Sequence, residues 1–237
     1  MTTEAFDEYA EKYDGWFLQN QAVLDSEVRL IARFLKDPGK ALSVGCGSGL
    51  FESLLRRDFG IEINDGLEPS DGMAEIARKR GMEVESASAE KIPHEDGSFD
   101  TLLFNGTPSY IDDLPKAFSE AFRVLKPGGR LVVADVPAES SYALLYNLAV
   151  AKGTWDDSVF DGVAPPDPYP VEFAAAAHWR TTKEKTKLLE QCGFVNLEFA
   201  QSLTRHPIFT NDSVEEPTAG YDRGDYVAIC AWKPAVK

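Results

Sequence analysis

The sequence predicts an α/β protein in which a mostly parallel sheet carries helices on both faces. Three observations predict this class. Short apolar segments alternate with amphipathic segments that are long enough for helical crossover connections between parallel strands. A glycine-rich loop, GCGSG at 45–49, follows the first apolar segment and leads directly into a helix. The 237 residues, 43% of them hydrophobic, suffice for one domain with a single core.

The chain begins with two expected helices and the first strand. Residues 4–36 hold two periodic polar–apolar stretches, which we expect to separate near Gly15 and Asn20. A short apolar run at 40–44 predicts a buried strand. The segment LFESLLRRDF at 50–59 predicts a helix, because its apolar residues fall on one face.

The next part of the chain predicts two strands on either side of a helix. The strands are expected at 60–67 and 82–87, and the helix at 71–80. Ser70 is a suitable N-cap, since a serine hydroxyl can accept from a free backbone N–H at the helix start. Gly81 is a suitable stop signal at the other end of the helix.

Two more strands surround the clearest helical pattern of the chain. The strands are expected at 99–105 and 130–136, and the KPGG sequence at 126–129 is expected to end the helix between them. The helix is expected at 114–125, because its apolar residues follow a spacing of three and four: Leu114, Ala117, Phe118, Ala121, Phe122 and Leu125.

The last third predicts a helix at 182–191 and two closing strands at 195–203 and 226–232, which we expect to pair like a hairpin. Residues 137–180 interrupt the alternation of strands and helices. This insertion is too apolar for a linker, and its aromatic residues predict a concave apolar pocket for a small molecule. The candidates to line that pocket are Tyr142, Tyr146, Trp155, Phe173 and Trp179.

The composition argues against several partners. Asp and Glu outnumber Lys and Arg by 39 to 24, so the net charge of −15 disfavours nucleic acids and anionic membranes. The apolar runs are too short to cross a bilayer. Residues 1–11 have no apolar stretch of a secretory signal, which favours the cytoplasm. Three widely spaced cysteines indicate reduced thiols and no zinc site. The chain is expected to be a monomer or a homodimer.

The glycine-rich loop indicates a ligand that approaches the backbone at a helix start. A dinucleotide fingerprint requires Gly or Ala at its sixth position, where this chain has Leu50. A phosphate loop of the Walker type requires a lysine, which is missing here. Glu68 follows the second strand, where a carboxylate can accept hydrogen bonds from both ribose hydroxyls. The pattern therefore favours a nucleoside that carries a small carboxylate.

Four motifs in order and spacing resemble the class I S-adenosylmethionine-dependent methyltransferases of the small-molecule type: GCGSG, LEPSDGM, SAEKIPHEDGSFD and LKPGGRLVVAD. The resemblance covers residues 5–136 well and 180–233 in outline. It implies a Rossmann-like three-layer α/β/α sandwich over residues 1–237, with a seven-stranded sheet whose last strand is antiparallel. It also implies lid helices within 1–36 and S-adenosyl-L-methionine as cofactor.

The resemblance also implies roles for individual residues. Tyr13 and Trp16 would close over the cofactor, and Glu68 would hold the ribose. The other implied cofactor-binding residues are Gly45, Cys46, Gly47 and Gly49 for the methionine part, Pro69, Met73, Ala89 and Glu90 for the adenine, and Asn105 for the amino group. The family usually has an acidic residue two positions before the first glycine. This chain has Ser43 there, which brings no charge.

Methyl transfer from a sulfonium needs alignment of the acceptor more than it needs a catalytic triad. A base is required only if the attacking atom must lose a proton. His178 and Tyr110 are the catalytic candidates, while His94 and His206 favour structural roles. Asp112 and Asp113 could bind a divalent cation but favour capping of the helix at 114; we therefore predict no metal. The alternatives are a non-catalytic module that binds the cofactor or its demethylated product, a nicotinamide-dependent oxidoreductase and a nucleic-acid methyltransferase.

Overall fold

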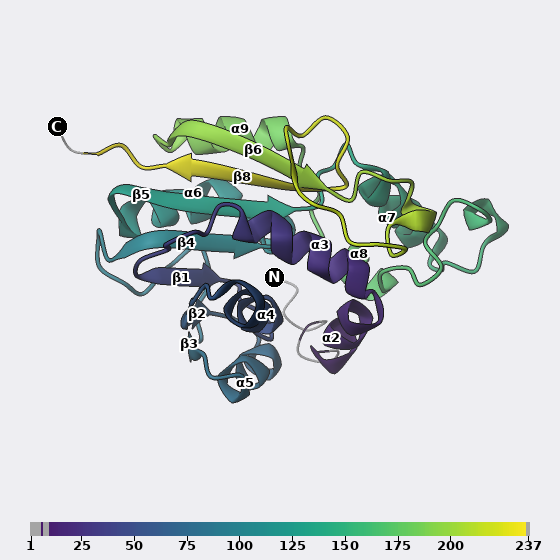
Figure 1. The fold of residues 1–237 in the computed structure, drawn as a ribbon, viewed down its shortest axis with the longest axis horizontal. Coiled ribbons are helices and arrows are strands. Elements are labelled where there is room, and N and C mark those ends of the chain that lie inside the picture. Colours follow the sequence, from purple (N-terminus) through teal and green to yellow (C-terminus); the bar gives the residue numbers. More distant parts are fainter. Residues whose placement is uncertain (1–5, 7–9, 236–237) are drawn as a thin grey trace.

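An eight-stranded mixed sheet forms the centre of the computed structural model, which describes residue 6 and residues 10–235 (Figure 1). The strand order is β3-β2-β1-β4-β5-β8-β6-β7. Neighbours from β3 to β5 are parallel, and β8 is antiparallel to both β5 and β6. The strands are β1 (Ala41–Val44), β2 (Asp65–Leu67), β3 (Glu83–Glu85), β4 (Phe99–Asn105), β5 (Leu125–Asp135), β6 (Val195–Ser202), β7 (Thr218–Ala219) and β8 (Tyr226–Trp232).

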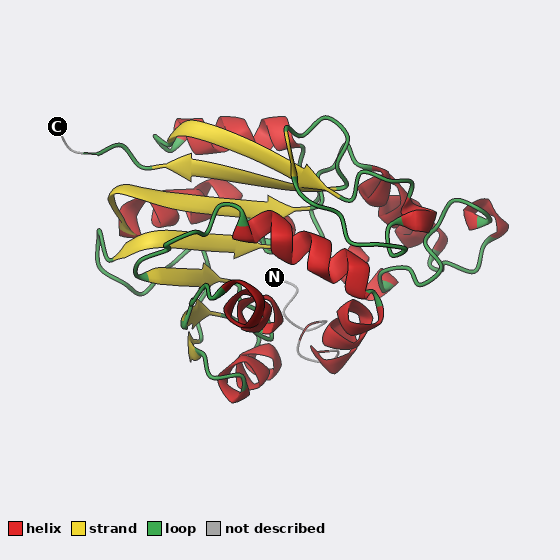
Figure 2. Ribbon diagram, viewed as in Figure 1, coloured by secondary structure: helices red, strands yellow, loops and turns green. Residues whose placement is uncertain are grey.

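The expected seven-stranded sheet with an antiparallel last strand is confirmed. The eighth strand is the two-residue β7, which pairs with β6 at the edge. Helices cover both faces of the sheet (Figure 2), and α3 lies across the face opposite to α6 and α9. The helices are α2 (Ala10–Gln19), α3 (Gln21–Ala32), α4 (Leu50–Phe59), α5 (Asp71–Lys79), α6 (Leu114–Val124), α7 (Ser141–Lys152), α8 (Val171–Ala175) and α9 (Thr182–Gln191).

Side-chain caps explain where several of these helices begin. The Ser70 hydroxyl accepts from the backbone N–H of Met73, as predicted for α5. The Asp113 carboxylate accepts from the N–H of Lys116 at the start of α6, so its predicted capping role is confirmed. Thr181 and Glu184 form a reciprocal capping box at α9.

The structure corrects two expectations and adds detail to a third. The first two helices separate only at Asn20, and Gly15 lies within α2. The sequence 126–129 does not end a helix before a strand but belongs to β5, which begins at Leu125 with a register shift against β4. The insertion at 137–180 contains α7 and α8. The amphipathic pattern of α7 is hard to recognise in the sequence, because an apolar residue, Leu144, lies on the exposed face of the helix. Leu144 is 69% exposed.

The carboxyl ends of the parallel strands meet at one edge of the sheet. There, α2 and the insertion with α7 and α8 lie beyond the strand ends (Figure 1). Ligands bind at this edge in open α/β sheets. Of the expected lid region, residues 1–5 and 7–9 lie outside the described residues. No helix in the described part of the chain has both the length and the apolar character needed to span a membrane.

Candidate functional site

The glycine-rich loop turns sharply between β1 and α4. The N–H groups of Gly45 and Cys46 both donate to the carbonyl of Leu67, at 2.7 and 3.0 Å. The backbone of Gly45 has a φ of +67°, and a Cβ there would lie 2.4 Å from Cγ2 of Thr107. A Cβ on Gly47 would meet nothing within 4 Å. Gly45 is therefore required by packing, whereas Gly47 presents its backbone to open space.

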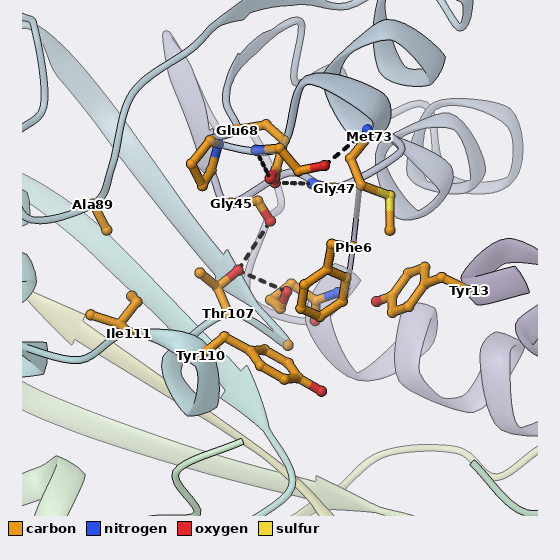
Figure 3. Close-up of a pocket in the computed structure, with 14 residues that line it drawn as sticks. Phe6, Tyr13, Gly45, Gly47, Glu68, Met73, Ala89, Thr107, Tyr110 and Ile111 are labelled. Carbon is orange, nitrogen blue, oxygen red and sulfur yellow. Dashed lines mark hydrogen bonds between the residues drawn. The ribbon is translucent and has the colours of Figure 1, made fainter. Parts of the chain in front are cut away.

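The Glu68 carboxylate is held at the tip of β2. Its Oε2 accepts from the N–H of Gly47 at 2.9 Å, and its Oε1 accepts from the N–H of Ser70 at 2.8 Å (Figure 3). The residue is 7% exposed. These hydrogen bonds fix the carboxylate between the glycine-rich loop and the start of α5. The carboxylate thus lies at the tip of β2 beside the open backbone of Gly47.

A cavity opens directly at these groups, between α2 and the ends of the strands (Figure 3). Phe6 and Tyr13 lie on one side of it, and Ala89 and Ile111 lie on the other. We call it the first cavity; its walls are Phe6, Tyr13, Gly45, Gly47, Glu68, Pro69, Ser70, Met73, Ala89, Asn105, Gly106, Thr107, Tyr110 and Ile111. Eight of the predicted cofactor-binding residues are thus brought together: Tyr13, Gly45, Gly47, Glu68, Pro69, Met73, Ala89 and Asn105.

The remaining predicted cofactor-binding residues lie elsewhere. Gly49 caps the start of α4 with a φ of +70°, and a Cβ there would lie 2.8 Å from Sδ of Met82. Glu90 is not among the described residues that line the first cavity. Cys46 lines a recess beside that cavity. Trp16 lines a second cavity, described below.

The recess beside the first cavity contains a carboxylate that the motifs did not reveal. The Ser43 hydroxyl donates to Oε1 of Glu52 at 2.6 Å, and both residues are 2% exposed. Burial raises the pKa of Glu52, against the opposing effect of the Ser43 hydrogen bond. Glu52 belongs to the first turn of α4 and shares the recess with Gly45, Gly47 and Asn105. An acidic group therefore exists next to position 43, although it comes from the helix.

The helix α2 is tied to the glycine-rich loop by one polar network. The Ser48 hydroxyl donates to Asp14 of α2. Arg80 donates to the other carboxylate oxygen of Asp14 at 2.6 Å and to the carbonyl of Ser48 at 2.7 Å. Tyr13, the neighbour of Asp14, is thereby held over the first cavity.

A second cavity adjoins the first. The two cavities share Tyr13, Gly106 and Tyr110, so these residues form a common wall. The rest of the second cavity consists mainly of aromatic rings from distant parts of the chain. Its other walls are Trp16, Phe17, Glu27, Phe51, Ser109, Asp135, Val136, Tyr146, Tyr169, Trp179 and Tyr226.

The rings of the second cavity pack against one another. The centroid of Tyr146 lies 5.4 Å from that of Trp179 and 5.6 Å from that of Tyr169. Trp16 contacts Tyr169 edge-on at 5.0 Å. Of the insertion aromatics predicted to line a pocket, Tyr146 and Trp179 line this cavity, whereas Trp155 lines an outer groove. Tyr142 is buried and pairs its hydroxyl with Thr210; Phe173 is buried against Phe6.

The two catalytic candidates occupy different environments. Tyr110 lies in the common wall, and its hydroxyl is 3.2 Å from that of Tyr169. Burial raises the pKa of Tyr110, so the phenol keeps its proton at neutral pH. The His178 side chain is 58% exposed, its Nε2 lies 3.3 Å from Oδ1 of Asp112, and it is not among the described residues that line either cavity.

Sequence reasoning missed Glu27, Glu52, Thr107 and Tyr226. The Thr107 hydroxyl donates to the carbonyls of Val44 and Gly45, and the Tyr226 hydroxyl donates to Oδ1 of Asn105 at 2.9 Å. Thr107 follows the predicted strand at 99–105, so its place at a strand end was a usable signal. Glu52 lies only three residues after the glycine-rich loop, but nothing in the motif marks it. Glu27 and Tyr226 are distant in sequence from every motif, and only the packing of the fold brings them to the site.

Comparisons with known proteins agree with this geometry. The family described as "Methyltransferase domain" matches residues 42–133. An uncharacterised protein of Methanocaldococcus jannaschii is 32% identical over 228 residues, which are 96% of this chain and 98% of that protein. The ubiquinone/menaquinone biosynthesis C-methyltransferase of Desulfotalea psychrophila is 31% identical over 140 residues, covering 55% of this chain and 56% of that protein.

A solved structure from Thermotoga maritima is similar over nearly the whole chain. It is described as a SAM-dependent methyltransferase and possible histamine N-methyltransferase. It is 32% identical, covers 97% of this chain and 99% of that one, and superposes with a TM-score of 0.82. Together with the glycine-rich loop, the acid at the tip of β2 and the cavity between them, these matches show that the chain belongs to the S-adenosylmethionine-dependent methyltransferases and uses S-adenosylmethionine as its cofactor.

Proposed function

We propose that the protein methylates a small-molecule acceptor that binds in the second cavity, while the cofactor binds in the first. The observation that carries the proposal is the common wall of Tyr13, Gly106 and Tyr110, which places the two cavities side by side. We therefore propose that cofactor and acceptor approach each other at this wall. A cavity lined mainly by rings suits a small, partly apolar molecule.

We assign groups of the first cavity and of its recess to two parts of the cofactor, the ribose and the amino group. Glu68 is placed to accept hydrogen bonds from ribose hydroxyls, and the open side of Gly47 lets a ligand approach the backbone. We assign to Glu52 the part that an acidic residue at position 43 plays elsewhere in the family, which is to hold the amino group directly or through water. Asn105 shares the recess with Glu52.

S-adenosylmethionine supplies a methyl group that is already activated on a sulfonium. The protein therefore mainly aligns the acceptor and excludes water. The rings of Tyr146, Tyr169 and Trp179 form an aromatic side of the proposed acceptor cavity. Because Tyr110 keeps its proton, we assign it a positioning role in the common wall. We assign no contact with the acceptor to His178, since its side chain is exposed beside Asp112.

The acceptor class follows from charge and from the relatives. A net charge of −15 disfavours nucleic acids and anionic surfaces as acceptors. The Thermotoga maritima protein is described as a possible histamine N-methyltransferase. A small nitrogen compound is accordingly the first candidate acceptor for this chain.

Two measurements test the proposal. Calorimetry with S-adenosylhomocysteine should show binding, and transfer of a labelled methyl group should be detected with at least one acceptor from a panel of small molecules. Binding of the demethylated cofactor without transfer to any acceptor would instead support a non-catalytic module. In the Tyr110→Phe variant, we expect a higher KM for the acceptor and an unchanged affinity for S-adenosylhomocysteine.

A further inference from the structure

Glu27 is a buried acid in the wall of the second cavity. It belongs to α3, is 5% exposed and lies among rings that include Tyr13, Tyr146 and Tyr226. Among the residues that the structure describes, no hydrogen-bond donor or cation contacts its carboxylate. Burial alone raises the pKa of Glu27 well above its usual value.

The other acid of the same cavity is satisfied. Asp135 forms a buried ion pair with Lys185 and accepts from the Ser109 hydroxyl at 3.0 Å. An isolated buried carboxylate costs free energy, which a partner of opposite charge can offset. The fold supplies such a partner to Asp135 but supplies none to Glu27 within the described chain. Glu27 is therefore a group that a ligand can complete.

The surroundings of Glu27 favour a cationic ligand. Faces of aromatic rings attract ammonium groups, and several rings line this cavity. The indole N–H of Trp179 is also buried without a partner in the described residues, so it can donate to an acceptor atom elsewhere on the ligand, though not to the ammonium group itself. The raised pKa favours the protonated form of Glu27, so the group would release its proton to solvent as it pairs with an ammonium, and the acidic surface of the whole protein attracts cations.

We propose that the acceptor is a small amine whose ammonium group binds against the Glu27 carboxylate within the ring-lined second cavity. This inference rests on the proposed function, because it takes the second cavity as the acceptor site. It concerns recognition of a positively charged nitrogen, wherever on the acceptor the methyl group is placed.

The test is calorimetry on the full chain saturated with S-adenosylhomocysteine. The probes are 2-phenylethylamine, tryptamine and butylamine, each beside the alcohol of the same carbon skeleton. We expect at least one amine to bind tenfold or more tightly than its alcohol. In Glu27→Gln this preference should fall to threefold or less, while the affinity for S-adenosylhomocysteine stays unchanged.

The matched control is Glu215→Gln. Glu215 is also a buried acid, but it accepts from the N–H and hydroxyl of Thr204 and does not line the described walls of the second cavity. This variant should keep the amine preference. Because Gln matches Glu in size and Glu27 has no partner to lose among the described residues, we expect Glu27→Gln to fold at least as stably as the wild type.

Three outcomes would overturn the inference: amines and alcohols bind equally, no amine binds, or Glu27→Gln keeps the preference. Failure of the proposed function is distinguishable from these. If amines bind with the expected preference but labelled methyl is never transferred to any acceptor, the amine site stands and the proposed function fails.

Discussion

The two cavities of this protein share a wall but are built in different ways. The first is built around the backbone of the loop 45–49 and the Glu68 carboxylate, and apolar side chains such as Met73 and Ala89 complete its walls. The second consists of side chains from α2, α3, α4, α7 and the strand ends, which the fold brings together. The first cavity therefore depends on local geometry that few substitutions tolerate. The second depends on aromatic side chains and one acid, and these residues can vary while the fold stays the same.

The largest effect is expected for Gly45→Ala in the first cavity. The new Cβ would collide with Thr107, and alanine is disfavoured at a φ of +67°. We expect affinity for S-adenosylhomocysteine to fall by two orders of magnitude or more, and stability to fall by about 2 kcal/mol or more. Calorimetry and urea unfolding measure the two effects.

Gly153→Ala is the matched control for this substitution. Gly153 has a similar φ of +73° at the end of α7, but a Cβ there would meet nothing within 4 Å. It should lose some stability while keeping cofactor affinity. Equal losses of affinity in both variants would contradict a specific role for the turn at Gly45.

A smaller but selective effect is expected for Glu68→Gln. The amide keeps the size of the side chain but loses the charge and one acceptor atom. We expect cofactor affinity to fall about tenfold to a hundredfold, as is usual for a lost charged hydrogen bond. Binding of an amine to the second cavity should change little. A variant that binds S-adenosylhomocysteine like the wild type would remove Glu68 from the site.

The reverse selectivity is expected for Tyr146→Leu. Leucine keeps the position apolar but removes the ring that packs against Trp179 and Tyr169. We expect the KM for a cationic acceptor to rise about threefold to thirtyfold, the range of one ring–cation contact. Steady-state kinetics at saturating cofactor measure it. A fall in cofactor affinity with no change in the KM for the acceptor would contradict the assignment of cofactor and acceptor to separate cavities.

The smallest effect is expected for Asp225→Asn, at a residue that contacts the start of α7 and so supports the second cavity. Asp225 accepts from the N–H of Ser141 at the start of α7, and burial raises its pKa to about 6. A pKa raised in the folded state stabilises the fold at low pH, and this contribution is lost as pH rises through about 6. Asp225 should make the wild type about 1 kcal/mol more stable at pH 5 than at pH 7, and Asp225→Asn should abolish this difference. Urea unfolding of the wild type and of the variant at both pH values measures this difference. If the stability of both proteins depends on pH in the same way, this account of Asp225 is wrong.

The same contrast explains what the sequence could predict. Gly45, Gly47 and Glu68 belong to short motifs whose turn and strand-end geometry are set locally, so their meeting could be expected from spacing. Glu52 was missed because the family pattern directs attention to position 43, while the carboxylate comes from the next helix. Glu27 lies in an ordinary amphipathic helix, and nothing local separates it from an exposed glutamate.

The residues that line the second cavity could be predicted only in part from the sequence, for the same physical reason. The aromatic residues of 137–180 predicted an apolar acceptor pocket, but which rings face a cavity depends on how α7 packs. Tyr146 faces the cavity, whereas Tyr142, one turn earlier on the same helix, is turned toward Thr210. Such differences arise from tertiary packing, which a single sequence does not display.

A crystal structure of the protein with S-adenosylhomocysteine tests the central claim most directly. We predict that the ribose contacts Glu68, that the amino group lies toward Glu52 and that the sulfur faces the common wall at Gly106 and Tyr110. A ligand bound in the ring-lined second cavity, or a sulfur that faces away from that wall, would contradict the division of the site into two adjoining cavities.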